Sequence, residues 1–133
     1  MSTIFFPFPA GAAHYTGILN QTARRIAAWD LADPELWAIF VDQFRKHPDD
    51  GNDQWRGEYW GKMMRGGCIT CQYVPELYSI LEASVRDLLS TAEPDGRISS
   101  YSREWQFRGW DLWGRKCVLL GLQYFLEICR DPT

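Results

Sequence analysis

Two similar stretches of the chain carry side chains that could bind or cleave a sugar. Residues 58–62 read Glu-Tyr-Trp-Gly-Lys, and residues 111–116 read Asp-Leu-Trp-Gly-Arg-Lys, so the pattern returns after 53 residues. Two carboxylates held ~5–9 Å apart can act as acid and as nucleophile or base in glycoside cleavage, and aromatic rings stack on sugar C–H surfaces. The same residues suit helix packing, because an acid in the first turn favours the helix dipole. The sequence leaves both interpretations open.

The composition is that of one globular domain without a nucleic-acid-binding surface. The 133 residues include 14 Lys and Arg against 17 Asp and Glu, for a formal net charge of -3, and no basic block is present. Phosphate contacts need a concentrated positive face, so nucleic acid is not an expected partner. Aromatic residues make up 15% of the chain, which is enough for a core, a sugar-stacking surface, or both.

Nothing in the sequence indicates export or membrane insertion. Residues 1–15 form a leader that contains Pro and Gly but has no basic start and no apolar stretch of signal-peptide length. No segment approaches the ~20 apolar residues of a membrane-spanning helix. We therefore expect a soluble, cytoplasmic protein with no membrane partner and with reduced cysteines.

The four cysteines do not have the pattern of a metal site. Cys68 and Cys71 have C-x-x-C spacing, but they fall inside a predicted helix rather than on the tight turn of a zinc knuckle. Cys117 and Cys129 lie ~18 Å apart along one predicted helix, too far to share an ion. We expect small buried thiols, with no metal and no cofactor in this chain.

Apolar residues recur at helical spacing along nearly the whole chain, which predicts an all-α fold. Helices are expected at residues 16–29, 34–47, 55–73, 75–91 and 111–129, with a loop at 48–53 and an extended crossover at 98–108. Asp33 and Pro34 have the residue types of an N-cap and a first helical position. The last helix has so little polar surface that we expect it to be buried on most sides. The apolar side chains that then need a cover are Leu119, Leu122, Phe125 and Ile128.

Three segments together resemble a known family of glycoside hydrolases. They are Trp-Arg-Gly-Glu-Tyr-Trp-Gly-Lys at 55–62, Asp-Gly-Arg-Ile-Ser-Ser-Tyr at 95–101 and Gly-Trp-Asp-Leu-Trp-Gly-Arg-Lys at 109–116. In order and spacing they are similar to the N-terminal part of the β-L-arabinofuranosidase-like enzymes, glycoside hydrolase family 127 and its relatives. The resemblance covers residues 17–131. It implies that residues 16–133 are helix pairs forming the first part of an incomplete (α/α)6 toroid, a helical N-terminal fragment of the catalytic domain.

The resemblance also implies which residues face a carbohydrate substrate. The positions that the inner helices would direct toward a central pocket are Trp60, Lys62, Trp110, Asp111 and Trp113. The family's nucleophile is a cysteine thiolate bound to zinc with carboxylate partners, and we expect these residues beyond the end of this chain. Cys117 stands where the arabinofuranosidase branch has a substrate-contacting histidine, so arabinofuranoside specificity does not follow.

Three functions are consistent with these features. In the first, the chain is the leading portion of a glycosidase acting on plant-type or other glycans, inactive by itself and partnered by the remainder of the enzyme. In the second, Glu58 and Asp111 form a catalytic pair within this chain. In the third, the chain is a self-standing helical protein that binds carbohydrate or another chain without catalysis, and a homo-oligomer partner covers its apolar helix.

Overall fold

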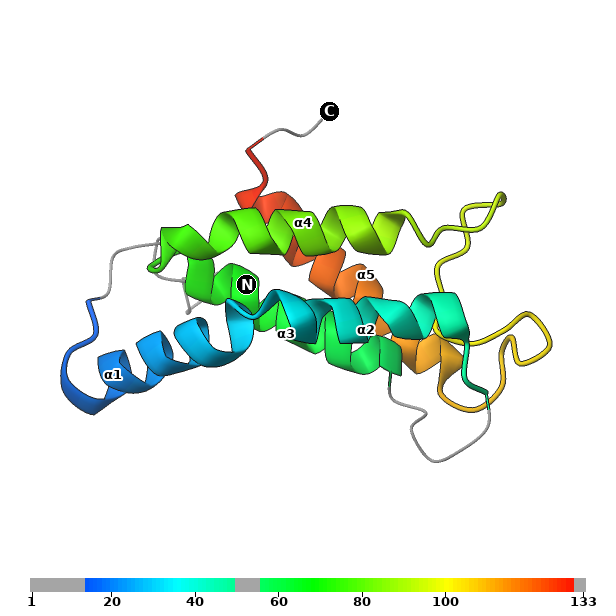
Figure 1. Ribbon diagram of the computed structural model, residues 1–133, viewed down its shortest axis with the longest axis horizontal. Helices are drawn as coiled ribbons and strands as arrows, with labels where there is room; N and C mark the ends of the chain where they lie inside the picture. The colour runs from blue at the N-terminus through cyan, green and yellow to red at the C-terminus, as the bar shows by residue number, and fades with distance from the viewer. Residues whose placement is uncertain (1–13, 50–55, 131–133) are drawn as a thin grey trace, which may run out of the picture.

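A computed structural model describes residues 14–49 and 56–130, which form helices joined by loops (Figure 1). The α-helices are α1 (Gly17–Ile26), α2 (Pro34–Lys46), α3 (Arg56–Cys71), α4 (Tyr78–Leu89) and α5 (Asp111–Ile128). No strand occurs within the described ranges, so the prediction of an all-α fold is confirmed for them. The predicted leader lies outside these ranges except for His14 and Tyr15, which are exposed, and most of the predicted loop at 48–53 lies outside them too.

A local sequence signal accounts for the start of the second helix but not for the end of the first. Ala27–Leu31 continues α1 as a π-helical turn, η1, so the first helix runs past its predicted end at Trp29. Asp33 caps α2, because its carboxylate accepts the backbone N–H groups of Glu35 at 2.9 Å and Leu36 at 3.3 Å. This satisfies donors that have no partner inside the helix. The predicted helix start at Asp33 is therefore confirmed.

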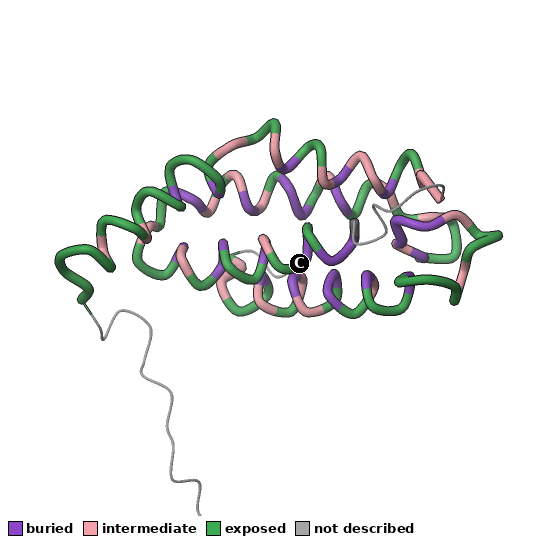
Figure 2. The backbone as a smooth tube through the Cα atoms, turned by 90° about the horizontal axis from the view of Figure 1, so that it is seen from below, coloured by how far each residue is buried: buried purple, intermediate pink, exposed green. Residues whose placement is uncertain are grey.

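The helices form two layers with the core between them. Figures 1 and 2 show α2 and α4 in one layer and α3 and α5 in the other, while α1 extends away from both. Buried side chains of the two layers meet in the middle, and they include Trp37, Val41, Phe44, Trp60, Met64, Leu81, Leu88, Val118 and Phe125. A 3₁₀ turn, η2 (Pro75–Leu77), leads into α4. α1 contributes no buried residue, so this core does not stabilise it directly.

The helices α3 and α5 run parallel and touch along their backbones. A Cβ atom added to Gly57 would lie 3.2 Å from Gly114, and one added to Gly61 would lie 2.1 Å from the carbonyl oxygen of Cys117. A Cβ atom added to Gly121 would lie 3.0 Å from the carbonyl oxygen of Gly61. The contacts advance in the same direction along both helices, which defines the parallel arrangement. The Gly of each Trp-Gly step thus allows the two repeats to approach each other closely.

One face of α5 is uncovered, contrary to the expectation that this helix is buried on most sides. The exposed positions, seven residues apart, are Leu112, Leu119 and Leu126, each between 59% and 68% exposed. Phe125 is buried and stacks on Tyr78 with 6.1 Å between ring centroids, while Leu122 and Ile128 are half-buried. Neither α5 nor any other helix in the described ranges is long and apolar enough to span a membrane.

The connection from α4 to α5 is non-helical, but it is bent rather than extended. Arg97 organises it from inside, since its guanidinium donates to the carbonyl oxygens of Tyr101 at 2.6 Å and Ser102 at 3.0 Å. The same guanidinium pairs with Glu93 at the start of the connection. A buried arginine satisfied by backbone carbonyls holds the segment against the end of the bundle. The predicted crossover is therefore a folded loop.

Candidate functional site

The first turn of α3 buries a carboxylate that has a partner for one oxygen. Glu58 is 5% exposed, and its Oε1 lies 2.5 Å from Nζ of Lys62, one helical turn later. Its Oε2 is buried and has no hydrogen-bond partner of regular geometry among the described residues. Because Oε2 has almost no accessible surface, it is shielded by the protein around it.

Trp113 and Lys116 on α5 lie beside this carboxylate. The Trp113 side chain is 40% exposed, and hydrogen bonding from it helps to lower the pKa of Glu58. The indole thus approaches the carboxylate without completing a regular hydrogen bond to Oε2. Lys116 Nζ lies 3.7 Å from the centroid of the Trp113 ring, a cation–π contact. We call Glu58, Lys62, Trp113 and Lys116 the Glu58–Trp113 cluster.

The charges of the cluster keep Glu58 ionised. The hydrogen bond from Lys62 has the largest effect and lowers the pKa of Glu58, whereas burial alone would raise that pKa. The positive charges of Lys62 and Lys116 lower the pKa further. The hydrogen bond to Glu58 in turn raises the pKa of Lys62. At neutral pH the cluster therefore contains an ionised carboxylate paired with Lys62 and a second ammonium, that of Lys116, on the Trp113 ring.

Such a set of groups can bind a polyhydroxylated ligand. A carboxylate oxygen accepts from a hydroxyl, an ammonium donates to one, and the open part of an indole packs on C–H groups. A lowered pKa makes Glu58 a poor proton donor, because efficient general acids have a pKa near the working pH. The cluster has the chemistry of binding rather than of acid catalysis.

Asp111, predicted to contact a sugar, is instead fully occupied by the protein. Its Oδ1 accepts from Ser99 Oγ at 2.5 Å and from Arg115 Nε at 2.9 Å, and its Oδ2 accepts from the backbone N–H of Phe107 at 2.9 Å. Burial would raise the pKa of Asp111, but the hydrogen bonds, led by that of Arg115, lower it. Asp111 therefore holds the loop before α5 in place, and its carboxylate is closed to a ligand.

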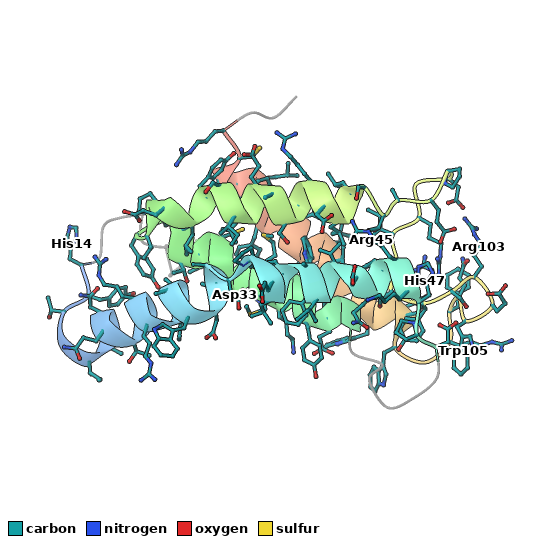
Figure 3. All side chains as sticks on the ribbon, viewed as in Figure 1. His14, Asp33, Arg45, His47, Arg103 and Trp105 are labelled. Atoms are coloured by element: carbon teal, nitrogen blue, oxygen red, sulfur yellow. The ribbon has the colours of Figure 1, made fainter. Side chains whose placement is uncertain are left out.

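His47 holds the same loop from the other side. Its Nε2 lies 3.1 Å from the carbonyl oxygen of Ser99, and its φ of 43° places it in the left-handed region at the end of α2. Figure 3 shows His47 with Arg103 and Trp105 at one end of the molecule and His14 at the other. Arg103 pairs with Glu93 and Asp95, so this end of the molecule is cross-linked by ion pairs.

The five residues predicted to contact a sugar do not come together in one place. Trp60 lies in the core, fully buried, and its indole N–H donates to Ser84 Oγ at 3.0 Å. It has no face open to a ligand, so we correct its expected role to packing. Trp110 precedes α5 and is 44% exposed. Lys62 and Trp113 are the two predicted contacts that meet in the Glu58–Trp113 cluster.

The structure gives no support to a catalytic pair formed by Glu58 and Asp111. A glycosidase acid needs a raised pKa so that it carries a proton near neutral pH. The pKa of both side chains is lowered. Each is therefore ionised, and the hydrogen bonds of Asp111 leave it no role with a substrate.

The cysteines are free thiols. Burial raises the pKa of Cys68 to about 12, and burial also raises the pKa of Cys71 on the same helix and of Cys117 behind the cluster. Within residues 14–49 and 56–130, no group of three or more His, Cys, Asp or Glu side chains could hold a metal ion. These residues do not fit the zinc site of the family that the sequence resembles.

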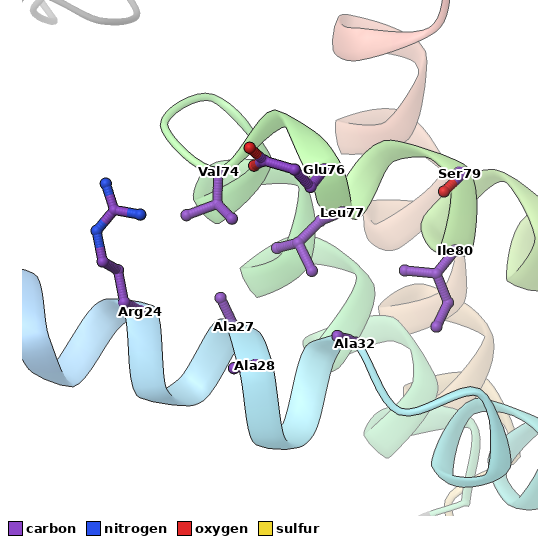
Figure 4. Close-up of a pocket in the computed structure, with 9 residues that line it drawn as sticks. All are labelled: Arg24, Ala27, Ala28, Ala32, Val74, Glu76, Leu77, Ser79 and Ile80. Atoms are coloured by element: carbon purple, nitrogen blue, oxygen red, sulfur yellow. The ribbon is translucent and has the colours of Figure 1, made fainter.

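A separate groove lies between η1 and the start of α4 (Figure 4). Its volume is about 550 Å³, and its lining includes Ala27, Ala28, Ala32, Val74, Leu77 and Ile80, with Arg24 and Glu76 also present. Figure 4 shows Ala27 of η1 pointing toward Val74 and Leu77 across the groove. Small side chains on a π-helical turn leave this space open, and no sequence pattern predicted that turn.

Comparison with known proteins finds no family model, no curated protein and no solved structure that matches this chain. The resemblance of the three segments therefore stays a prediction.

Sequence reasoning missed how the cluster is built. The spacing of Glu58 and Lys62 at i and i+4 is a visible signal for an ion pair. The position of Trp113 beside Glu58 has no local signal, because it depends on the parallel packing of α3 and α5. The exposed Trp113 and the buried Trp60 cannot be told apart from the repeated pattern alone.

Proposed function

We propose that this chain binds carbohydrate at the Glu58–Trp113 cluster, as the leading part of a helical-toroid glycoside hydrolase of the β-L-arabinofuranosidase-like type. The helix arrangement supports the proposal, because α3 and α5 run parallel and α4 connects them. Inner and outer helices alternate in this way in a toroid of helix pairs. The parallel pair also places the starts of both repeated helices at one end of the molecule.

The observation that carries the proposal is the Glu58–Lys62 ion pair beside the partly open Trp113. Lys62 is 63% exposed, so its ammonium can donate to a sugar hydroxyl while it stays paired with Glu58. The C–H face of the sugar can pack on the indole.

Isothermal titration with methyl glycosides, methyl L-arabinofuranosides among them, tests the site. Trp113→Ala should weaken sugar binding by about tenfold, the upper end of what one aromatic contact provides. Trp105→Ala is the matched control, because Trp105 is 37% exposed and lies in the loop before α5. We reject the site if no glycoside binds, or if the two variants weaken binding equally.

We propose further that the chain by itself does not cleave glycosides, because neither Glu58 nor Asp111 is poised as an acid. Aryl arabinofuranosides and other aryl glycosides should stay intact, with or without added zinc. Turnover that Glu58→Gln abolishes while the fold is intact would contradict this. Because Cys117 stands where the arabinofuranosidase branch has a substrate-contacting histidine, this proposal does not specify the sugar.

A non-catalytic binding or interaction protein is the second candidate, favoured by two uncovered apolar faces. One is the α5 face already described, and the other comprises Ile18, Leu19, Ile26 and Trp29 on α1 and η1, all of them exposed. Apolar patches of this kind mark contact sites. We propose that the remainder of the enzyme or a second copy covers them.

Free thiols suit a cytoplasmic location, which we also propose.

A further inference from the structure

We propose that the carbohydrate bound at the Glu58–Trp113 cluster is an acidic sugar, a uronate whose carboxylate pairs with Lys116. This inference rests on the proposed function, because it names the class of sugar that the cluster would select. The evidence for it is which charged side chains at the starts of α3 and α5 form ion pairs and which do not.

Within the Glu58–Trp113 cluster, Lys116 is the cation that forms no ion pair with a described carboxylate. Lys62 Nζ lies 2.5 Å from Oε1 of Glu58, which neutralises both groups. Arg115 pairs in the same way with the buried Asp111, at 2.8 Å between Nη2 and Oδ2. For Lys116 no carboxylate lies within ion-pair distance among the described residues, and its contact is the Trp113 ring.

The charge of Lys116 acts on the interior of the cluster. Its field lowers the pKa of Glu58 and also opposes the effect of burial on the pKa of Cys117. The cluster carries one negative and two positive charges, so its net charge favours an anion over a neutral ligand. Glu58 does not repel such an anion, because Lys62 compensates its charge.

The groups of the cluster match the parts of a uronate one by one. The ammonium of Lys116 can take the carboxylate in a charge-assisted hydrogen bond. The exposed ammonium of Lys62 can donate to a ring hydroxyl, and the part of Trp113 beside the Lys116 ammonium can pack on the C–H groups. A neutral sugar would use the last two groups and leave Lys116 without a counter-charge.

Methyl β-D-glucuronide and methyl β-D-glucoside test this directly, because they differ in the carboxylate at one carbon. At low salt the chain should bind the glucuronide about tenfold more tightly, the effect of one hydrogen bond between charged groups. The difference should shrink at about 0.5 M salt, where exposed charges are screened. Lys116→Met should abolish the preference of the chain for the glucuronide over the glucoside, whereas Lys116→Arg should retain it.

Arg65→Met is the control for a general loss of positive charge. Arg65 lies 5.1 Å from the centroid of the Tyr124 ring, a similar cation–π contact farther along the same helix pair. A preference that survives Lys116→Met, or that Arg65→Met also removes, overturns the inference. Equal affinity of wild type for both glycosides overturns the inference but leaves the proposed function standing. If neither glycoside binds and other methyl glycosides also fail, the proposed function falls as well.

Discussion

Glu58 and Asp111 occupy matching positions in the repeated pattern, but their oxygens are used differently. Asp111 lies against the folded loop, where Ser99 and the Phe107 amide reach its carboxylate. Glu58 pairs with Lys62 through one oxygen, and the Trp113 indole approaches its carboxylate. The repeat therefore supplies one acid that anchors the loop before α5 and one that lies beside Trp113.

Asp111→Asn should lower the free energy of unfolding by about 3 kcal/mol at pH 7, because it breaks a buried ion pair with Arg115. Urea unfolding followed by circular dichroism would measure it. Ser99→Ala removes one of the hydrogen bonds and should cost about 1 kcal/mol. An Asp111→Asn variant as stable as wild type would show that the carboxylate does not anchor the loop.

The pH dependence of the free energy of unfolding should reflect the ionisation of Asp111. The folded-state pKa of Asp111 is lowered, so its contribution is fully present above the unfolded value of about 4 and is lost as the pH falls through the folded value. Wild type should therefore lose stability below about pH 4, and Asp111→Asn should lose less over the same range. Urea unfolding midpoints of both proteins, measured from acid to neutral pH, would test this. Midpoints that fall equally in wild type and Asp111→Asn as the pH is lowered would contradict it.

Trp60 and Trp113 stand at the same place in the two motifs, yet one is in the core and the other is open. Trp60→Ala should lower the free energy of unfolding by ~3–5 kcal/mol, because the ring is fully buried and Ser84 loses its donor. Trp113→Ala should cost far less, since the ring is 40% exposed. Thermal or urea unfolding of both variants decides this. Equal losses would place Trp113 in the core and remove it from the site.

The pattern could predict the residue types of the site but not which tryptophan is open. Helical spacing gives the period of each helix, whereas exposure depends on which neighbour covers a given face. Here α5 lies on α3, and the indole of Trp60 reaches Ser84 on α4. No signal within either motif contains that information.

At the scale of the elements, helices with local signals were predicted well and those without were not. The start of α2 follows from the Asp33 cap, and the start of α5 at Asp111 matches its prediction. The π-helical turn Ala27–Leu31 was missed, because alanines carry no preference that separates it from an α-helix. Of the α5 side chains expected to need a cover, Leu119 is exposed but Phe125 is buried, since an apolar helix does not reveal which of its faces the neighbours cover.

The parallel contact of α3 and α5 depends on glycine. Gly61→Ala should cost about 2 kcal/mol or more, because the new Cβ would lie 2.1 Å from a backbone oxygen and the helices would have to separate. Gly66→Ala on the same helix is the matched control, since nothing lies within 4 Å of its Cβ position. It should stabilise by ~0.5–1 kcal/mol through helix propensity. Equilibrium urea unfolding that ranks Gly61→Ala as neutral would contradict the backbone contact.

The molecule as a whole has two layers that leave apolar faces open at α1 and α5. Helix pairs of this kind share a core with their neighbours, so a cover is expected for each open face. The layers themselves could be anticipated from helical spacing, whereas their order could not. That order depends on the glycine contacts between α3 and α5, which join segments far apart in the sequence.

The open face of α5 should cause self-association at high protein concentration, because burying exposed leucines is favourable. Sedimentation velocity over a range of concentrations would measure it. Leu119→Glu should shift the protein toward the monomer, and Ala83→Glu, which places the same charge on an exposed position of α4, should not. A wild-type chain that stays monomeric throughout would contradict a second copy as the cover.

The claim that the Glu58–Trp113 cluster binds a sugar can be tested most directly by nuclear magnetic resonance. Each of the seven tryptophans gives one indole N–H signal, which single substitutions can assign. On titration with a methyl glycoside, the Trp113 signal should shift in a saturable way, while the signals of buried Trp60 and distant Trp29 should stay in place. A spectrum in which Trp113 does not move, or in which Trp29 moves instead, would contradict the account.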